Sequence, residues 1–91
     1  MGLMHIFTVE GGYDQQRAIT PPPLDEISRL VCGVPEVSVV NYLGRTCQLV
    51  INAGGQQLEF PLNARASEIA GCSVYGVAII LDKVTLTDVT R

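Results

Sequence analysis

The stretch LVINAGGQQLEFPLNARASE, residues 49–68, decides how this chain is expected to fold. It opens with the end of an apolar, β-prone segment and continues into Asn-Ala-Gly-Gly (52–55), which is typical of a hairpin loop because glycine adopts positive φ at little steric cost. Residues 57–60 alternate between polar and apolar side chains and predict a returning strand. A proline ends that strand, and Asn63 is a residue type that caps helices. The stretch therefore predicts a strand, a turn, a second strand and an Asn-capped helix.

The residues before this stretch predict a hairpin, a helix and two further strands. Residues 5–9 are apolar and β-prone, a glycine pair follows, and residues 13–19 can return as a second strand. Thr20 is expected to cap a helix, because the three prolines after it fill positions whose N–H groups would lack intrahelical partners. That helix ends at Gly33, and strands are expected at 37–43 and 46–51.

The residues after it predict a short helix and the most strongly β-forming strand of the chain. The helix begins at Asn63 and stops at Gly71, and residues 74–81 form an apolar run expected to lie at the centre of the sheet. The expected order is β-β-α-β-β-β-α-β. This is an α+β fold with a largely antiparallel sheet and two short helices, in a single domain over residues 1–91.

The composition points to self-association. The chain has 91 residues, of which 47% are hydrophobic and only 16% are charged. A domain of this size hides a limited share of its surface, and exposed apolar patches are usually contact sites. We therefore expect a homo-oligomer, most simply a dimer.

The charge pattern and the cysteine pattern exclude several classes of partner. The net charge is −3 and the six basic residues are scattered, so duplex nucleic acid is not an expected partner. Three cysteines without C-x-x-C spacing and one histidine predict free thiols, no metal site and no cofactor. The N-terminus lacks a signal-peptide pattern and the longest apolar run, 77–81, is too short to span a bilayer, so a cytoplasmic protein without membrane contact is expected.

No catalytic motif is visible, and the sequence predicts a protein that is not an enzyme. His5 has no serine or cysteine partner in a recognisable motif, and the carboxylates show no pairing pattern. Phosphate-binding glycine loops and dinucleotide fingerprints are both missing. A small hydrolase or transferase stays as the third hypothesis, behind the two binding functions described below.

Five residues are candidates for ligand binding. Asn63 and Arg65 stand at a helix N-terminus, whose free N–H groups and positive dipole favour a phosphate or carboxylate; otherwise Asn63 only caps and Arg65 is solvated. If Asn63 only caps, Asp or Ser should replace it at little cost. Arg45 lies in a turn and is the next cation. Asn52 precedes glycines that permit close backbone approach or simply form a hairpin, and Tyr13 is suited to stack on a base or to pack.

The chain resembles an uncharacterised family of small bacterial and phage proteins, the domain of unknown function number 3846. The segments that carry the likeness span most of the chain: LDEISRLV at 24–31, LVIN at 49–52, FPLNARA at 60–66 and VYGVAII at 74–80. The resemblance implies a phage or mobile-element context and a cytoplasmic setting, and it implies no activity.

Two binding functions follow from these observations. The first is a small non-enzymatic phage or prophage accessory protein, which binds and sequesters a small anionic ligand such as a nucleotide immune signal and so acts against host defence. The alternative is a protein-interaction module that binds a host protein through a sheet edge or an apolar patch.

Overall fold

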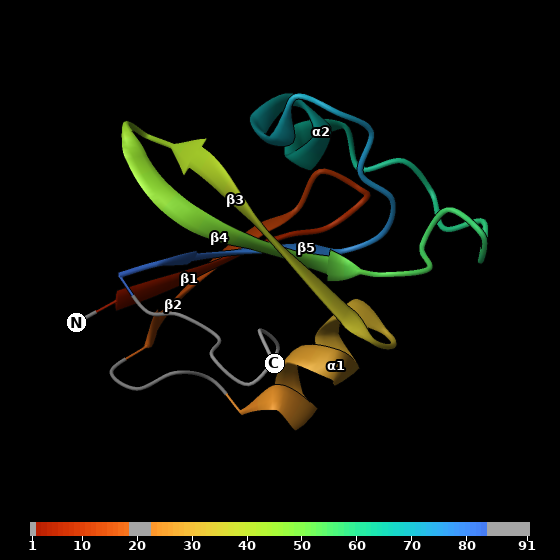
Figure 1. Cartoon of the computed structure of the whole chain (residues 1–91), viewed down its shortest axis with the longest axis horizontal. Helices are drawn as coiled ribbons and strands as arrows, with labels where there is room; N and C mark the ends of the chain where they lie inside the picture. Colours follow the sequence, from red (N-terminus) through yellow and green to blue (C-terminus); the bar gives the residue numbers. More distant parts are fainter. Residues whose placement is uncertain (1, 19–22, 84–91) are drawn as a thin grey trace.

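The computed structural model describes residues 2–18 and 23–83, which form five strands and two helices (Figure 1). The elements are β1 (Gly2–Phe7), β2 (Tyr13–Ala18), α1 (Leu24–Val31), β3 (Pro35–Tyr42), β4 (Arg45–Asn52), α2 (Ala64–Ala70) and β5 (Ala78–Asp82). The predicted α+β class, with an antiparallel sheet and two short helices, is confirmed. The expected cap Thr20 and residues 84–91 lie outside the described residues.

The five strands form one sheet in the order β2-β1-β5-β4-β3, and every neighbouring pair is antiparallel. The apolar run at 74–81 contributes β5, which lies at the centre of the sheet as its composition predicts. Each of its neighbours belongs to a hairpin: β1 to the hairpin with β2, and β4 to the hairpin with β3. β5 therefore joins the two hairpins into one sheet.

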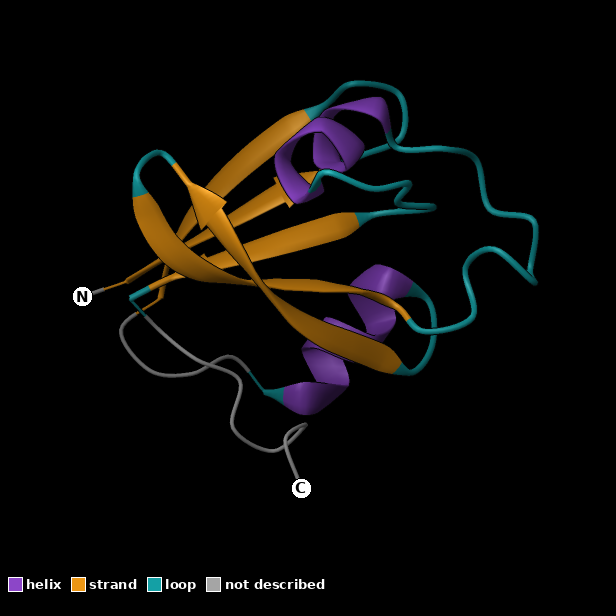
Figure 2. Ribbon diagram, turned by 45° about the horizontal axis from the view of Figure 1, so that its top comes forward, coloured by secondary structure: helices purple, strands orange, loops and turns teal. Residues whose placement is uncertain are grey.

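The two helices cover opposite faces of the sheet (Figures 1 and 2). Successive side chains of a strand point to opposite faces, so Ile79 and Leu81 of β5 pack with Ile27 of α1, and the remaining apolar side chains of β5 pack with Ala66 of α2. The chain thus has two cores, one on each side of the sheet. Among the described residues, no helix has the length and apolar character needed to cross a membrane.

The strand predicted at residues 57–60 is absent, and residues 53–59 form consecutive turns instead. Backbone N–H groups in this segment donate to nearby carbonyls, including Leu58 N to Gly54 O at 2.9 Å and Phe60 N to Gly55 O at 3.0 Å. The physical reason is competition for a sheet edge. β4 is already paired on both sides, with β3 and with β5, so no edge remains for residues 57–60.

Candidate functional site

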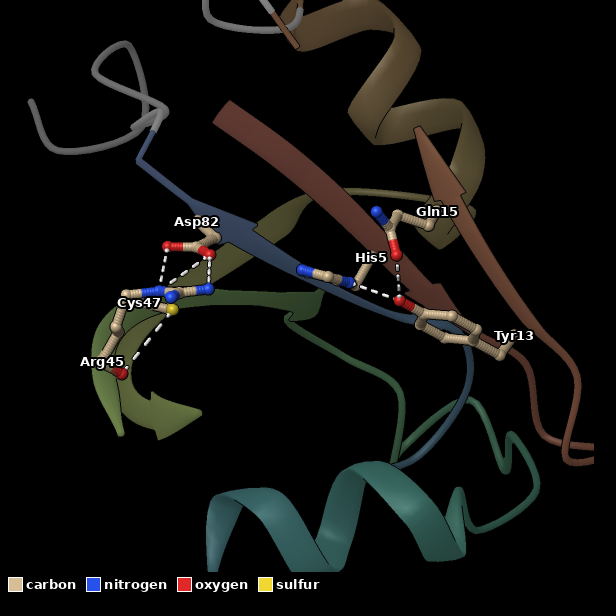
Figure 3. A network of polar contacts seen from close by, with 6 residues as sticks. All are labelled: His5, Tyr13, Gln15, Arg45, Cys47 and Asp82. Atoms are coloured by element: carbon tan, nitrogen blue, oxygen red, sulfur yellow. Dashed lines mark hydrogen bonds and ion pairs between the residues drawn. The ribbon is translucent and has the colours of Figure 1, made fainter. Parts of the chain in front are cut away.

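Helix α2 covers only part of its sheet face, and the uncovered part carries a polar cluster. We define the polar cluster as six side chains from four strands (Figure 3): His5, Tyr13, Gln15, Arg45, Cys47 and Asp82. Strand register brings them together. His5 pairs with Gln15 of β2 on one side and with Ile80 of β5 on the other, and Asp82 follows Ile80 by two positions on β5. The cluster is thus made by residues from both ends of the described chain.

Arg45 and Asp82 form the ion pair of this cluster. The Arg45 Nε donates to Asp82 Oδ1 at 3.1 Å and to Oδ2 at 3.0 Å, and Nη2 also donates to Oδ2. The Asp82 carboxylate is 3% exposed, whereas the Arg45 side chain is 48% exposed. Hydrogen bonding to the guanidinium lowers the pKa of Asp82 below its usual range. The predicted cation Arg45 is therefore anchored through Nε and Nη2 while half of its side chain faces solvent.

His5 is buried between this ion pair and a tyrosine. Its Nδ1 lies 2.6 Å from the Tyr13 hydroxyl, which in turn donates to Gln15 Oε1 at 3.0 Å. Because the one hydrogen of the Tyr13 hydroxyl is donated to Gln15, we infer the tautomer in which Nδ1–H donates to the tyrosine oxygen and Nε2 is left as an acceptor. Nε2 is buried and has no hydrogen-bond partner among the described residues. Burial lowers the pKa of His5, against the opposite influence of the Asp82 carboxylate, so a neutral ring is favoured.

Four rings, from His5, Phe7, Tyr13 and Tyr42, form an aromatic cluster beside the polar groups. The ring of Phe7 lies 5.1 Å from Tyr13 and 6.0 Å from Tyr42, and His5 lies 5.2 Å from Tyr42. Tyr13 is 49% exposed, whereas the other three rings are buried. Burial and the neighbouring Tyr42 raise the pKa of the Tyr13 hydroxyl. This ring is the one that a ligand can reach.

Arg65 stands at the α2 end of the same aromatic cluster. It belongs to the first turn of α2, and its Cζ lies 5.7 Å from the centre of the Phe7 ring, within the range of a cation–π contact. Its charge also acts on Tyr13, whose pKa it tends to lower. Three of the five predicted ligand residues, Tyr13, Arg45 and Arg65, therefore lie along one face of the sheet.

Asn63 is the predicted cap of α2, and the structure confirms this role. Its Oδ1 accepts from Ala66 N at 3.1 Å, and its Nδ2 donates at 2.9 Å to the carbonyls of Phe7 and Gly76. The residue is fully buried. Asn63 thus does more than cap, because it ties the start of α2 to β1 and to the segment before β5. Because neither Asp nor Ser supplies two amide hydrogens, these bonds argue that replacing Asn63 by either residue costs more than the loss of a cap alone would suggest.

Asn52 lies at the opposite end of β4 from Arg45 and apart from the polar cluster. Its Nδ2 donates at 3.0 Å to the carbonyls of Val31 and Cys32, which end α1, and its Oδ1 accepts from Gly54 N at 2.7 Å. These bonds hold the left-handed Cys32, with φ of 63°, at the end of the helix. Asn52 also lines an open groove, together with Val34, Leu58 and residues of the turns that follow β4. It therefore joins a helix end to a turn.

Sequence reasoning missed His5 and Asp82 as members of the site. The available signal was a single histidine inside an apolar strand and a carboxylate directly after the apolar run 77–81. Buried charged groups need a partner, so Asp82 after a buried strand calls for a cation. Within residues 2–18 and 23–83, no three His, Cys, Asp or Glu side chains are placed to hold a metal ion.

Comparisons of the chain with protein-family models, with curated proteins and with solved structures found no match. The resemblance to the domain of unknown function 3846 stays a prediction that rests on the motifs of the sequence.

Proposed function

We propose that this protein binds a small anionic ligand that carries an aromatic ring, such as a nucleotide, on the uncovered part of the α2 face. The observation that carries the proposal is the placement of two arginines at the two ends of one aromatic cluster. Arg65 lies over Phe7, and Arg45 reaches the His5 end through its bond to Asp82. Between them the exposed ring of Tyr13 is held by His5.

Each part of the site has a distinct task in this proposal. The guanidinium of Arg65 offers paired donors to a phosphate or carboxylate, the geometry that suits such oxygens best. Tyr13 offers an aromatic face for a base, and its hydrogen bonds to His5 and Gln15 hold the ring in place. Arg45 is oriented by Asp82 and presents its exposed part to a second anionic group. The arrangement is largely pre-organised, which reduces the entropy lost on binding.

Binding without chemical conversion is the mode that the side chains support. The one thiol of the polar cluster, Cys47, donates to the Arg45 carbonyl at 3.7 Å, and burial raises its pKa. A protonated, buried thiol is a poor nucleophile. A phage accessory protein that sequesters a nucleotide immune signal needs affinity and no turnover. We keep this anti-defence role as part of the proposal, on the basis of the resemblance to phage proteins.

The test is binding of a panel of mono-, di- and cyclic nucleotides, measured by thermal denaturation and then by calorimetry. A ligand at about 100 times its dissociation constant should add about 2.7 kcal/mol to the free energy of unfolding. Arg65→Ala should raise the dissociation constant by about 10- to 150-fold, since a charge-assisted hydrogen bond contributes roughly 1.5–3 kcal/mol.

The matched control is Arg29→Ala, because Arg29 is also an exposed arginine on a short helix but belongs to α1, on the opposite side of the sheet. It should leave binding unchanged. The proposal fails if no member of the panel binds, or if the two arginine variants bind equally well.

A further inference from the structure

The two edges of the sheet differ in chemistry. The edge strand β2 is polar, with Asp14 and Arg17 among its residues. The edge strand β3 has the sequence PEVSVVNY and carries Glu36 as its one charge. Its central Val39 is 72% exposed. Natural sheets usually protect an open edge with lysines, prolines or bulges, and the middle of β3 has none of these.

The free backbone groups of β3 follow from its register with β4. Residues of an antiparallel pair alternate between those that exchange hydrogen bonds and those that do not. Tyr42 and Arg45 flank the two-residue turn Leu43-Gly44, whose φ values of 53° and 80° are those of a type I′ turn, so this pair exchanges hydrogen bonds. Ala53 N donates to Val34 O, as the same alternation requires.

This alternation directs the backbone groups of Val37, Val39 and Asn41 to the outer edge of the sheet. They make no hydrogen bond within the part of the chain that the structure describes. Pro35, which has no N–H, also occupies an outward position, and it ends the row of donors on that side. The edge therefore offers three donors and three acceptors in a regular row.

We propose that β3 pairs with β3 of a second copy of this chain, antiparallel and about a two-fold axis at Val39. Val39 then lies opposite the partner's Val39, and Val37 lies opposite the partner's Asn41. Three outward-facing pairs at two hydrogen bonds each give about six new hydrogen bonds. The proposal goes beyond the proposed ligand site and does not depend on it.

The self-complementarity of the strand favours a second copy over another occupant. An isologous contact requires the same surface on both partners, and the outward backbone groups of Val37, Val39 and Asn41 all find mates in this register. No like charges face each other, because Glu36 falls opposite the partner's Tyr42. The two sheets would continue as one, with both α2 faces on the same side.

The experiment uses sedimentation of the full chain at about 100 μM with charge variants at the axis. Val39→Lys and Val39→Glu each place like charges directly opposite across the two-fold, so each alone should raise the dimer dissociation constant at least tenfold. An equimolar mixture of the two should restore dimers, because the charges opposite each other are then unlike. Circular dichroism checks that the variants fold, which is expected because Val39 is exposed.

Val34→Lys is the matched control, since Val34 is 73% exposed and lies outside the paired segment. It should leave the dimer intact. A wild-type chain that sediments as a monomer would overturn the proposal and leave the edge for a strand of another protein. Dimers of Val39→Lys as tight as the wild type, or no recovery in the mixture, would overturn the proposed register.

Discussion

Helix α2 divides one face of the sheet into a covered half and an uncovered half. The two halves differ in whether their buried polar side chains have hydrogen-bond partners. In the covered half, Asn63 is fully buried and all three of its side-chain hydrogen bonds are made inside the protein. In the uncovered half, His5 is 3% exposed, yet its Nε2 has no partner among the described residues. A buried polar group in a native protein is normally satisfied, so the exception marks where to look for function.

The largest expected loss of stability comes from replacing Asn63, the buried polar residue of the covered half. Asn63→Ala removes the cap of α2 and leaves the carbonyls of Phe7 and Gly76 without their donor. A lost cap costs about 0.5–2 kcal/mol and a buried unsatisfied group about 1–3 kcal/mol, so we expect a loss of about 3 kcal/mol in the free energy of unfolding. Urea denaturation measures it.

Asn63→Asp tests the contribution of the two amide hydrogens separately from that of the capping oxygen. The carboxylate keeps the capping acceptor but offers no amide hydrogens to the two carbonyls, so this variant should also lose more than about 1 kcal/mol. An Asn63→Asp protein as stable as the wild type would show that capping alone accounts for the residue.

In the uncovered half, the titration of His5 should make the free energy of unfolding depend on pH. This effect is of intermediate size. The pKa of His5 in the folded protein is lowered from 6.5 by burial. Well above pH 6.5 the His5 ring is neutral in both the folded and the unfolded state, and its contribution to stability is complete. As the pH falls below 6.5 the unfolded chain takes up a proton first, so stability decreases until the lowered folded pKa is reached.

The slope from one such group is at most about 1.4 kcal/mol per pH unit. We expect His5→Phe to remove this slope between pH 7.5 and 5.5, because phenylalanine keeps an aromatic ring in the cluster and does not titrate. Urea midpoints of both proteins across that range give the measurement. Parallel curves for the two proteins would mean that His5 has the same pKa folded and unfolded, and that its burial has no electrostatic consequence.

The parts of the fold that were predictable depend on local pattern, and the parts that were not depend on long-range competition. The apolar run that forms β5 and the cap at Asn63 are visible within a few residues of sequence. The failed strand at 57–60 has a suitable local pattern, but its intended partner β4 is occupied by β3 and β5. No local pattern carries that information.

The same distinction explains the site. Arg45, Arg65 and Tyr13 stand out because charged or aromatic residues beside turns and helix ends are recognisable in sequence. His5 and Asp82 enter the site only through the register of β1 against β5, where Leu3 pairs with Asp82. Asn52 was chosen for its glycine turn, and its bonds go to the end of α1 because β3 brings that helix end back beside β4.

Arg65→Ala should have the smallest effect on the free energy of unfolding. This variant therefore distinguishes a residue that binds ligand from a residue, such as Asn63, that holds the fold. Arg65 follows Asn63 by two residues, but it is exposed and contacts the face of Phe7 from outside. An exposed cation–π contact contributes about 0.5–1 kcal/mol, so the midpoint of unfolding without ligand should shift little. Arg65→Lys should shift it less, because the charge remains.

If the proposed site is right, Arg65→Ala weakens nucleotide binding more than Asn63→Ala does, which is the reverse of their order in loss of stability. Arg65→Ala should lose affinity for a nucleotide while remaining nearly as stable as the wild type. Asn63→Ala, assayed at a temperature where it is still folded, should retain affinity while being much less stable. A large loss of stability in Arg65→Ala would instead place this arginine with the structural residues of the covered half, because its main task would then be to hold α2 on Phe7.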